Sequence, residues 1–179
     1  MLDSRGFDLW ADGYDSAVGL SDDDGTYPFA GYRRVLGRIC ERVLEKGRPA
    51  VLDIGFGTAA LTAKLYAAGC GIWGQDFSGR MIELARAKMP SACLFQGDFS
   101  RGLHPELAAR RYDFIIATYA LHHLDDGRKT RLIRSLTQLL KPGGQILIGD
   151  VAFPDRAALL RCRAASGDEW DDGEFYFVC

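Results

Sequence analysis

The sequence predicts an open, doubly wound α/β fold with a mostly parallel sheet, and three observations lead to this prediction. From Pro49 onward, short apolar segments alternate with segments of helical periodicity. The apolar segments are continuous runs, which are typical of parallel strands covered on both faces. A glycine or an acidic residue follows most of these runs before the next helix. In such folds ligands bind at the carboxyl ends of the strands.

Two helices are expected ahead of the sheet, separated by the loop "SDDDGTYP". The second covers residues 29–47 and ends at Gly47. The first carries three aromatic residues at helical spacing: Phe7, Trp10 and Tyr14. We therefore expect residues 1–48 to form a helical cap over the ligand site and residues 49–179 to form the α/β core.

Five strands and five helices then follow in alternation. Ser78 is a good N-cap for the second of these helices, and Pro142 with Gly143 is expected to end the fourth. The expected strands lie within residues 50–55, 71–76, 91–98, 112–120 and 145–153. The expected helices lie within residues 58–69, 78–89, 104–111, 125–144 and 154–166.

Composition excludes several classes of protein. A net charge of −2 and a pI of about 5.9 argue against a nucleic-acid-binding face, which would be strongly basic. The sequence has no apolar run of the roughly 20 residues that cross a bilayer, and the N-terminus lacks a signal-peptide pattern. The five cysteines are dispersed, without a C-x-x-C pair. We expect a cytoplasmic protein with free thiols and no metal site.

The turn after the first strand is built around Gly55 and Gly57, in "GFGTAA". Glycines there permit a tight turn and a close approach of ligand to backbone. The pattern alone fits a dinucleotide or S-adenosylmethionine, and a plain strand-to-helix turn is the remaining alternative. Asp76 ends the second strand, where either ligand would present its ribose hydroxyls.

Asp53 separates these alternatives, because it lies two residues before Gly55 at the end of the strand. A diphosphate at the turn would repel a carboxylate, whereas a ligand with an ammonium group and a sulfonium would attract it. S-adenosylmethionine carries both cations and no phosphate. The alternative is that Asp53 caps the turn by accepting backbone N–H groups.

The third strand also ends in an acid, Asp98, which can accept a hydrogen bond from an adenine amino group. Phe99 offers a backbone N–H to a ring nitrogen, and Phe77 is placed to pack on the purine. The alternative is that Asp98 caps a helix and both phenylalanines belong to the core.

With these residues identified, the chain resembles the class I S-adenosylmethionine-dependent methyltransferases. The resemblance rests on "VLDIGFGTA", "GQDFS", "QGDF", "IIATYALHHL" and "LKPGGQILIGD", in this order. The N-terminal "FDLWADGYD" is similar to the bacterial small-molecule methyltransferases called YrrT. The resemblance implies a Rossmann-like methyltransferase fold with strand order 3-2-1-4-5.

The resemblance also implies roles for individual residues. Ala117 would offer its carbonyl to the methionine amino group, and Tyr119 would lie near the transferring methyl. Trp10 and Tyr14 would fold over the cofactor. The remaining cofactor contacts would come from the residues already singled out: Asp53, Gly55, Gly57, Asp76, Phe77, Asp98 and Phe99.

Two features depart from the family pattern. Ala59 stands where a third glycine is common, and we expect the two strands that normally close the sheet to be missing. At most one short strand fits residues 175–178. The fifth strand would then be a bare apolar edge, which predicts a homodimer through that edge, a covering C-terminal segment, or a core truncated at its C-terminal end.

For the reaction, His122 and His123 are the candidates for a general base, with His122 preferred, and Tyr119 is a further catalytic candidate. The alternative is that both histidines belong to the strand-to-helix turn. The absence of an N-P-P-[YF] tetrapeptide and the low net charge favour a small-molecule methyl acceptor. The leading hypothesis is thus an S-adenosylmethionine-dependent methyltransferase. A non-catalytic binder of S-adenosylmethionine or S-adenosylhomocysteine and an NAD-dependent oxidoreductase are the alternatives.

Overall fold

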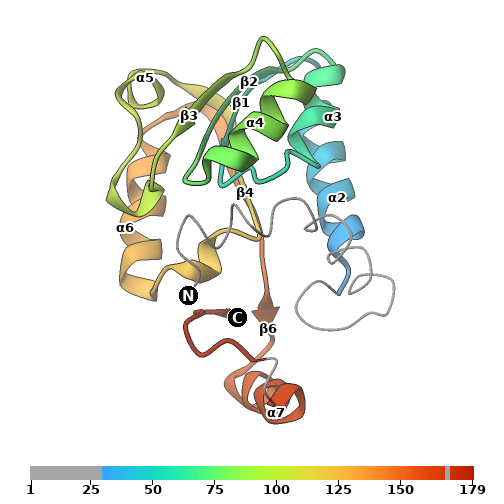
Figure 1. Ribbon diagram of the computed structural model, residues 1–179, viewed down its shortest axis with the longest axis vertical. Coiled ribbons are helices and arrows are strands. Elements are labelled where there is room, and N and C mark those ends of the chain that lie inside the picture. The colour runs from blue at the N-terminus through green and yellow to red at the C-terminus, as the bar shows by residue number, and fades with distance from the viewer. Residues whose placement is uncertain (1–29, 168–169) are drawn as a thin grey trace.

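A computed structural model describes residues 30–167 and 170–179 of the chain (Figure 1). Five parallel strands form the main sheet in the order β3-β2-β1-β4-β5, which confirms the predicted fold class. The strands are β1 (Ala50–Ile54), β2 (Gly71–Asp76), β3 (Cys93–Gln96), β4 (Tyr112–Thr118) and β5 (Leu140–Gly149). The predictions for Trp10 and Tyr14 lie outside the described residues, and the division at residue 48 stays a prediction.

Helices cover both faces of this sheet (Figure 1). One face packs against α2 (Tyr32–Leu44), α3 (Thr62–Ala67) and α4 (Gly79–Lys88). The other packs against α5 (Pro105–Ala108) and α6 (Asp126–Thr137). None of the helices in these described parts is both long and apolar enough to cross a bilayer.

The continuous apolar strands are explained by two separate cores. Val51 of β1 belongs to the core beneath α2, α3 and α4, whereas its neighbour Leu52 belongs to the core beneath α5 and α6. Ile115 and Ile116 of β4 divide between the two cores in the same way. All four side chains are fully buried, so neighbouring positions in the middle of these strands are apolar on both faces of the sheet.

Local predictions succeed at one helix end and fail at another. The Ser78 side chain accepts a hydrogen bond from the Met81 N–H, so Ser78 is the N-cap of α4 as predicted. The expected helix over residues 125–144 is wrong at its C-terminal end, because α6 stops at Thr137 and β5 already begins at Leu140. The Tyr112 N–H donates to the Leu139 carbonyl, so pairing with β4 takes this segment out of the helix.

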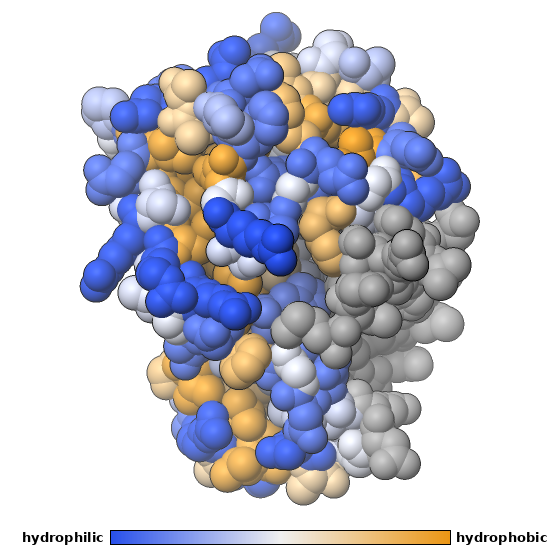
Figure 2. Space-filling view, turned by 60° about the vertical axis from the view of Figure 1, so that its left-hand side comes forward, coloured by the Kyte–Doolittle hydropathy of each residue, from blue (hydrophilic) through white to orange (hydrophobic). Residues whose placement is uncertain are grey.

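The expected fifth strand over residues 145–153 is also divided. β5 ends at Gly149, and β6 (Ala152–Phe153) pairs in parallel with β7 (Phe177–Val178) as a separate small sheet. Between them lies α7 (Arg156–Ser166), below the main body in Figure 1. Figure 2 shows apolar surface at this lower end, where Leu160 and Val178 are 50% and 42% exposed.

No described residue adds a strand beside β5, so this strand is an edge of the main sheet within the described parts of the chain. Its N-terminal half is partly covered: the Arg42 Nε donates to Gln145 at 3.0 Å. Ile148, further along, remains 37% exposed. Homodimerisation through this edge stays a prediction.

Candidate functional site

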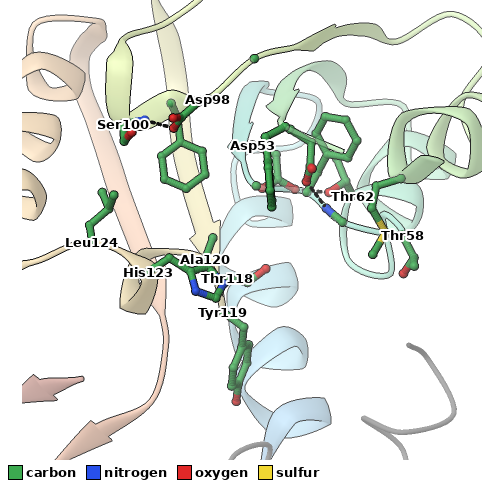
Figure 3. Close-up of a pocket in the computed structure, with 18 of the residues that line it drawn as sticks. Asp53, Thr58, Thr62, Asp98, Ser100, Thr118, Tyr119, Ala120, His123 and Leu124 are labelled. Atoms are coloured by element: carbon green, nitrogen blue, oxygen red, sulfur yellow. Dashed lines mark hydrogen bonds between the residues drawn. The ribbon is translucent and has the colours of Figure 1, made fainter. Parts of the chain in front are cut away.

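A cavity of about 580 Å³ opens at the carboxyl ends of the central strands (Figure 3). Figure 3 shows Asp53 and Thr62 on one side and Asp98 and Ser100 on another. Below them lie Thr118, Tyr119, Ala120 and His123. Asp76 lines the same space. The three acids predicted to lie along one rim therefore do line one cavity, although their ligand contacts stay predictions.

The glycine turn forms the floor beside β1. Gly55 has φ +71°, and a Cβ at this position would lie 2.6 Å from the Cβ of Ala120. Gly57 has φ +53°, and its N–H donates to Asp76 Oδ2 at 2.9 Å. Gly55 is thus required by both backbone conformation and space, whereas Gly57 is required by conformation alone.

Ala59, at the position of the third glycine, has φ +61° and is completely buried. Left-handed backbone costs an alanine roughly 1–2 kcal/mol. Its methyl group packs in the core with α3 and α4, and this burial offsets part of that cost. The extra methyl is therefore accommodated by a strained but well-packed turn.

Asp53 has the most unusual environment in the cavity. Its side chain is 1% exposed, and its Oδ2 accepts a hydrogen bond from the Thr62 hydroxyl. The other oxygen, Oδ1, is buried and has no hydrogen-bond partner among the described residues. Burial raises the pKa of Asp53 to about 7. The bonds expected if Asp53 merely capped the turn are not formed in this part of the chain, so a buried acceptor is left for a ligand.

Both carboxylate oxygens of Asp76 accept hydrogen bonds, unlike those of Asp53. Its Oδ2 accepts from the Gly57 N–H and its Oδ1 from the Ser78 N–H, both at 2.9 Å. These bonds fix the carboxylate between the glycine turn and the start of α4. Since each carboxylate oxygen can accept a second bond, the fixed group can still receive ligand hydroxyls.

Asp98 combines both roles weighed from the sequence. Its side chain accepts from the Ser100 N–H at 2.8 Å and so caps the short helix η1 (Phe99–Arg101), while it also lines the cavity. Phe99 is likewise both a core residue and a wall of the cavity. Phe77 is half-buried and lines the cavity as well.

The end of β4 differs from the prediction by one residue. Ala117 is 2% exposed in the core, and Thr118, Tyr119 and Ala120 line the cavity instead. Tyr119 has φ +50°, a conformation that favours glycine, and its ring lies 4.9 Å from that of Tyr32. The strained turn aims the backbone after β4 into the cavity.

His122 does not line the cavity within the described residues, and its role as the general base stays a prediction. Its Nδ1 lies 2.6 Å from Asp150 Oδ1, and its ring is buried. Burial opposes its positive charge, but the bond to Asp150 and the charges of Asp150 and Glu174 raise the pKa of His122. Its neighbour His123 lines the cavity instead, and burial lowers the pKa of His123 to about 4.

Gln75 is a supporting residue that sequence analysis missed. Its amide donates to the Gly102 carbonyl at 3.0 Å and accepts from the His104 N–H at 2.7 Å. These bonds anchor the loop that follows η1 to the centre of the sheet. In the sequence, Gln75 could have been recognised as a polar residue that directly follows the apolar part of β2. Its side chain is buried, with the residue 2% exposed.

Comparison with known proteins agrees with this architecture. The methyltransferase domain model matches residues 51–144. An uncharacterized methyltransferase of Anoxybacillus flavithermus is 38% identical over 152 residues, which cover 85% of this chain and 68% of that protein. A relative of the same description from Bacillus cytotoxicus is 39% identical over 153 residues, with the same 85% and 68% coverage.

Solved structures share the fold. The DhpI-SAM-HEP complex aligns with a TM-score of 0.64 at 22% identity, covering 92% of this chain and 70% of that one. DesVI of Streptomyces venezuelae aligns with a TM-score of 0.56 at 22% identity, covering 69% of this chain and 52% of that one. Family model, relatives and fold agree, and the chain belongs to the methyltransferase domain family.

Proposed function

We propose that this chain binds S-adenosylmethionine in the cavity and transfers its methyl group to a small molecule. The observation that carries the proposal is Asp53, which lines the cavity and whose buried Oδ1 has no hydrogen-bond partner among the described residues. An ammonium group would supply the missing hydrogen bond and the missing charge. A pyrophosphate would add negative charge beside a buried carboxyl group, which is unfavourable.

The other walls suit the remaining parts of the ligand. Asp76 would receive the ribose hydroxyls, and Phe77 would pack on the purine. Asp98 would accept from the adenine amino group, with the Phe99 N–H opposite a ring nitrogen. The ligands in the names of two solved neighbours, the DhpI-SAM-HEP and DhpI-SAH complexes, support this assignment.

Methyl transfer is an in-line displacement in which the acceptor's electron pair forms a bond to the methyl carbon as the carbon–sulfur bond breaks. S-adenosylhomocysteine is the leaving group, and the sulfonium supplies the electrophile. The chain has to align acceptor and methyl and to exclude water. Thr118 and Tyr119 would lie nearest this step, because Thr118 ends β4, Tyr119 follows it, and both line the same cavity as Asp53.

Binding tests the first half of the proposal. S-adenosylhomocysteine and NADH are titrated separately into the purified chain in a calorimeter. We expect a saturable heat for S-adenosylhomocysteine only. Binding of NADH alone would contradict the assignment of the cavity.

Catalysis is tested by transfer of labelled methyl from S-adenosylmethionine to pooled metabolites and, separately, to RNA and to protein. Label in the metabolite fraction alone supports a small-molecule acceptor, and label in a macromolecular fraction would overturn it. Tight binding of S-adenosylhomocysteine without transfer to any fraction would favour the non-catalytic binder.

A further inference from the structure

A second group of polar side chains lies between the loop after β4 and the C-terminal segment. His122 and His123 belong to the short helix η2 (Leu121–His123), and Glu174 precedes β7. His122 Nε2 lies 3.6 Å and His123 Nδ1 3.8 Å from the same oxygen, Glu174 Oε1. One ligand atom from each of the three residues lies within 4.8 Å of the other two.

The hydrogen bonds around Asp150 decide which atom of His122 carries a proton. The Asp150 side chain is 1% exposed and accepts from three backbone N–H groups, those of Leu121, His122 and Val151. Such a carboxylate can only accept, so the 2.6 Å contact requires a hydrogen on His122 Nδ1. In the neutral ring, Nε2 is then an acceptor.

The acceptor atom His122 Nε2 lies next to a second acceptor atom, Glu174 Oε1. The Tyr176 hydroxyl donates to Glu174 Oε2 at 2.5 Å, which leaves Oε1 turned toward the two histidines. Two acceptor atoms 3.6 Å apart repel each other, and a proton on Nε2 or a metal ion bound by both atoms would remove this repulsion. The nearby ammonium of Lys129 donates to the Phe175 carbonyl.

We propose that His122, His123 and Glu174 form a binding site for a divalent transition-metal ion of the zinc type. Tetrahedral zinc with bonds of about 2.1 Å places neighbouring ligand atoms ~3.4 Å apart, close to the two separations to Glu174. Asp150 supplies the carboxylate behind a metal-binding histidine that is usual in zinc sites. Two nitrogens and one oxygen favour Zn²⁺, Co²⁺ or Ni²⁺ over Mg²⁺ and Ca²⁺.

A bound ion would connect Glu174 of the C-terminal segment with the short helix η2. Because His123 of η2 also lines the cavity, the ion would hold the C-terminal segment next to the cavity wall. This inference does not depend on the proposed methyl transfer. If the metal-site inference is wrong, the chain will not bind the metal ion. If the proposed function is wrong, the chain will not bind S-adenosylhomocysteine in the calorimetric titration.

The test uses the full chain, freed of metal with a chelator and dialysed, with the exposed Cys93 and Cys179 replaced by serine. CoCl₂ and ZnCl₂ are titrated separately, with MgCl₂ as the comparison ion. We expect one equivalent of Co²⁺ with visible absorption but no sulfur-to-cobalt charge transfer. Zn²⁺ should compete for the same site and raise the melting temperature, and Mg²⁺ should do neither.

Glu174→Gln should weaken Co²⁺ binding by at least about tenfold, since loss of even a supporting carboxylate costs 10- to 100-fold in metal sites. The matched control is His104→Gln, because His104 stacks on Phe95 away from the group and should leave binding unchanged. If Glu174→Gln fails to fold, Tyr176→Phe should still lower affinity measurably. Absence of Co²⁺ and Zn²⁺ binding, or equal binding by Glu174→Gln, would show that a proton occupies the group and would overturn the proposal.

Discussion

Asp53 leads to a prediction in which stability and ligand binding change in opposite directions. Asp53→Asn keeps the size of the side chain and an oxygen for the Thr62 hydroxyl, but it removes the ionisable group. Burial raises the pKa of Asp53 from 3.8 to about 7 in the folded chain. The folded state therefore binds this proton more tightly than the unfolded state, and stability falls as the pH rises between these two values.

The magnitude follows from the size of that interval. A difference of about 3 pKa units corresponds to a cost of about 4 kcal/mol in the unliganded protein above pH 7. Between pH 5 and pH 8 the cost grows by about 2–3 kcal/mol. Asparagine does not titrate, so the stability of the variant relative to the parent should increase by about that amount over this range. Comparing two pH values removes any constant effect of the amide on packing.

Binding should change the other way. A hydrogen bond to a charged group contributes about 1.5–3 kcal/mol, so the variant should bind S-adenosylhomocysteine about 10- to 150-fold more weakly. Stability is measured by urea denaturation at pH 5 and pH 8, and affinity by calorimetry at pH 8. Asp172→Asn is the control, because Asp172 is 73% exposed and pairs with Arg163 on the surface.

Two outcomes would refute the reasoning. If the stability difference between variant and parent is the same at both pH values, Asp53 does not have a raised pKa. If affinity for S-adenosylhomocysteine is unchanged while the control behaves as expected, the buried carboxyl group does not hold the ligand's ammonium.

Three further changes test other parts of the structure. Gly55→Ala and Gly57→Ala should each cost about 1–2 kcal/mol in backbone strain, but only the first collides with Ala120 and should lower the melting temperature much further. Equal losses would contradict this geometry. Ile148→Lys should shift any dimer to monomer in gel filtration with light scattering, and a parent chain that is monomeric at high concentration would exclude the edge interface. Gln75→Ala leaves two anchored loop groups without their bonds and should cost about 1–3 kcal/mol in urea denaturation; an unchanged midpoint would contradict that role.

The fold was predictable because its signals are local. Each strand is an apolar run buried on two faces, and the turns between strands and helices carry glycine or acidic residues. The failure at residues 138–144 has a different origin. Leu139 and Leu140 continue the helical pattern, and only pairing of Leu140 with Tyr112 on β4 shows that the helix has already ended.

The site was predictable to the extent that it depends on strand ends. Asp53, Asp76 and Asp98 line one cavity because parallel strands place their carboxyl ends at the same edge. The sequence could not separate His122 from His123, since adjacent residues in a turn point in different directions. The partner that decides between them, Asp150, lies 28 residues away in sequence.

A carboxyl group with a pKa of about 7 also makes ligand capture a proton-coupled event. Near pH 7 about half of the unliganded molecules hold a proton on Asp53, and an incoming ammonium would displace it. Binding would then release about half a proton per site to the buffer at that pH. The apparent enthalpy measured in phosphate and in Tris would differ accordingly, and the difference would disappear in Asp53→Asn.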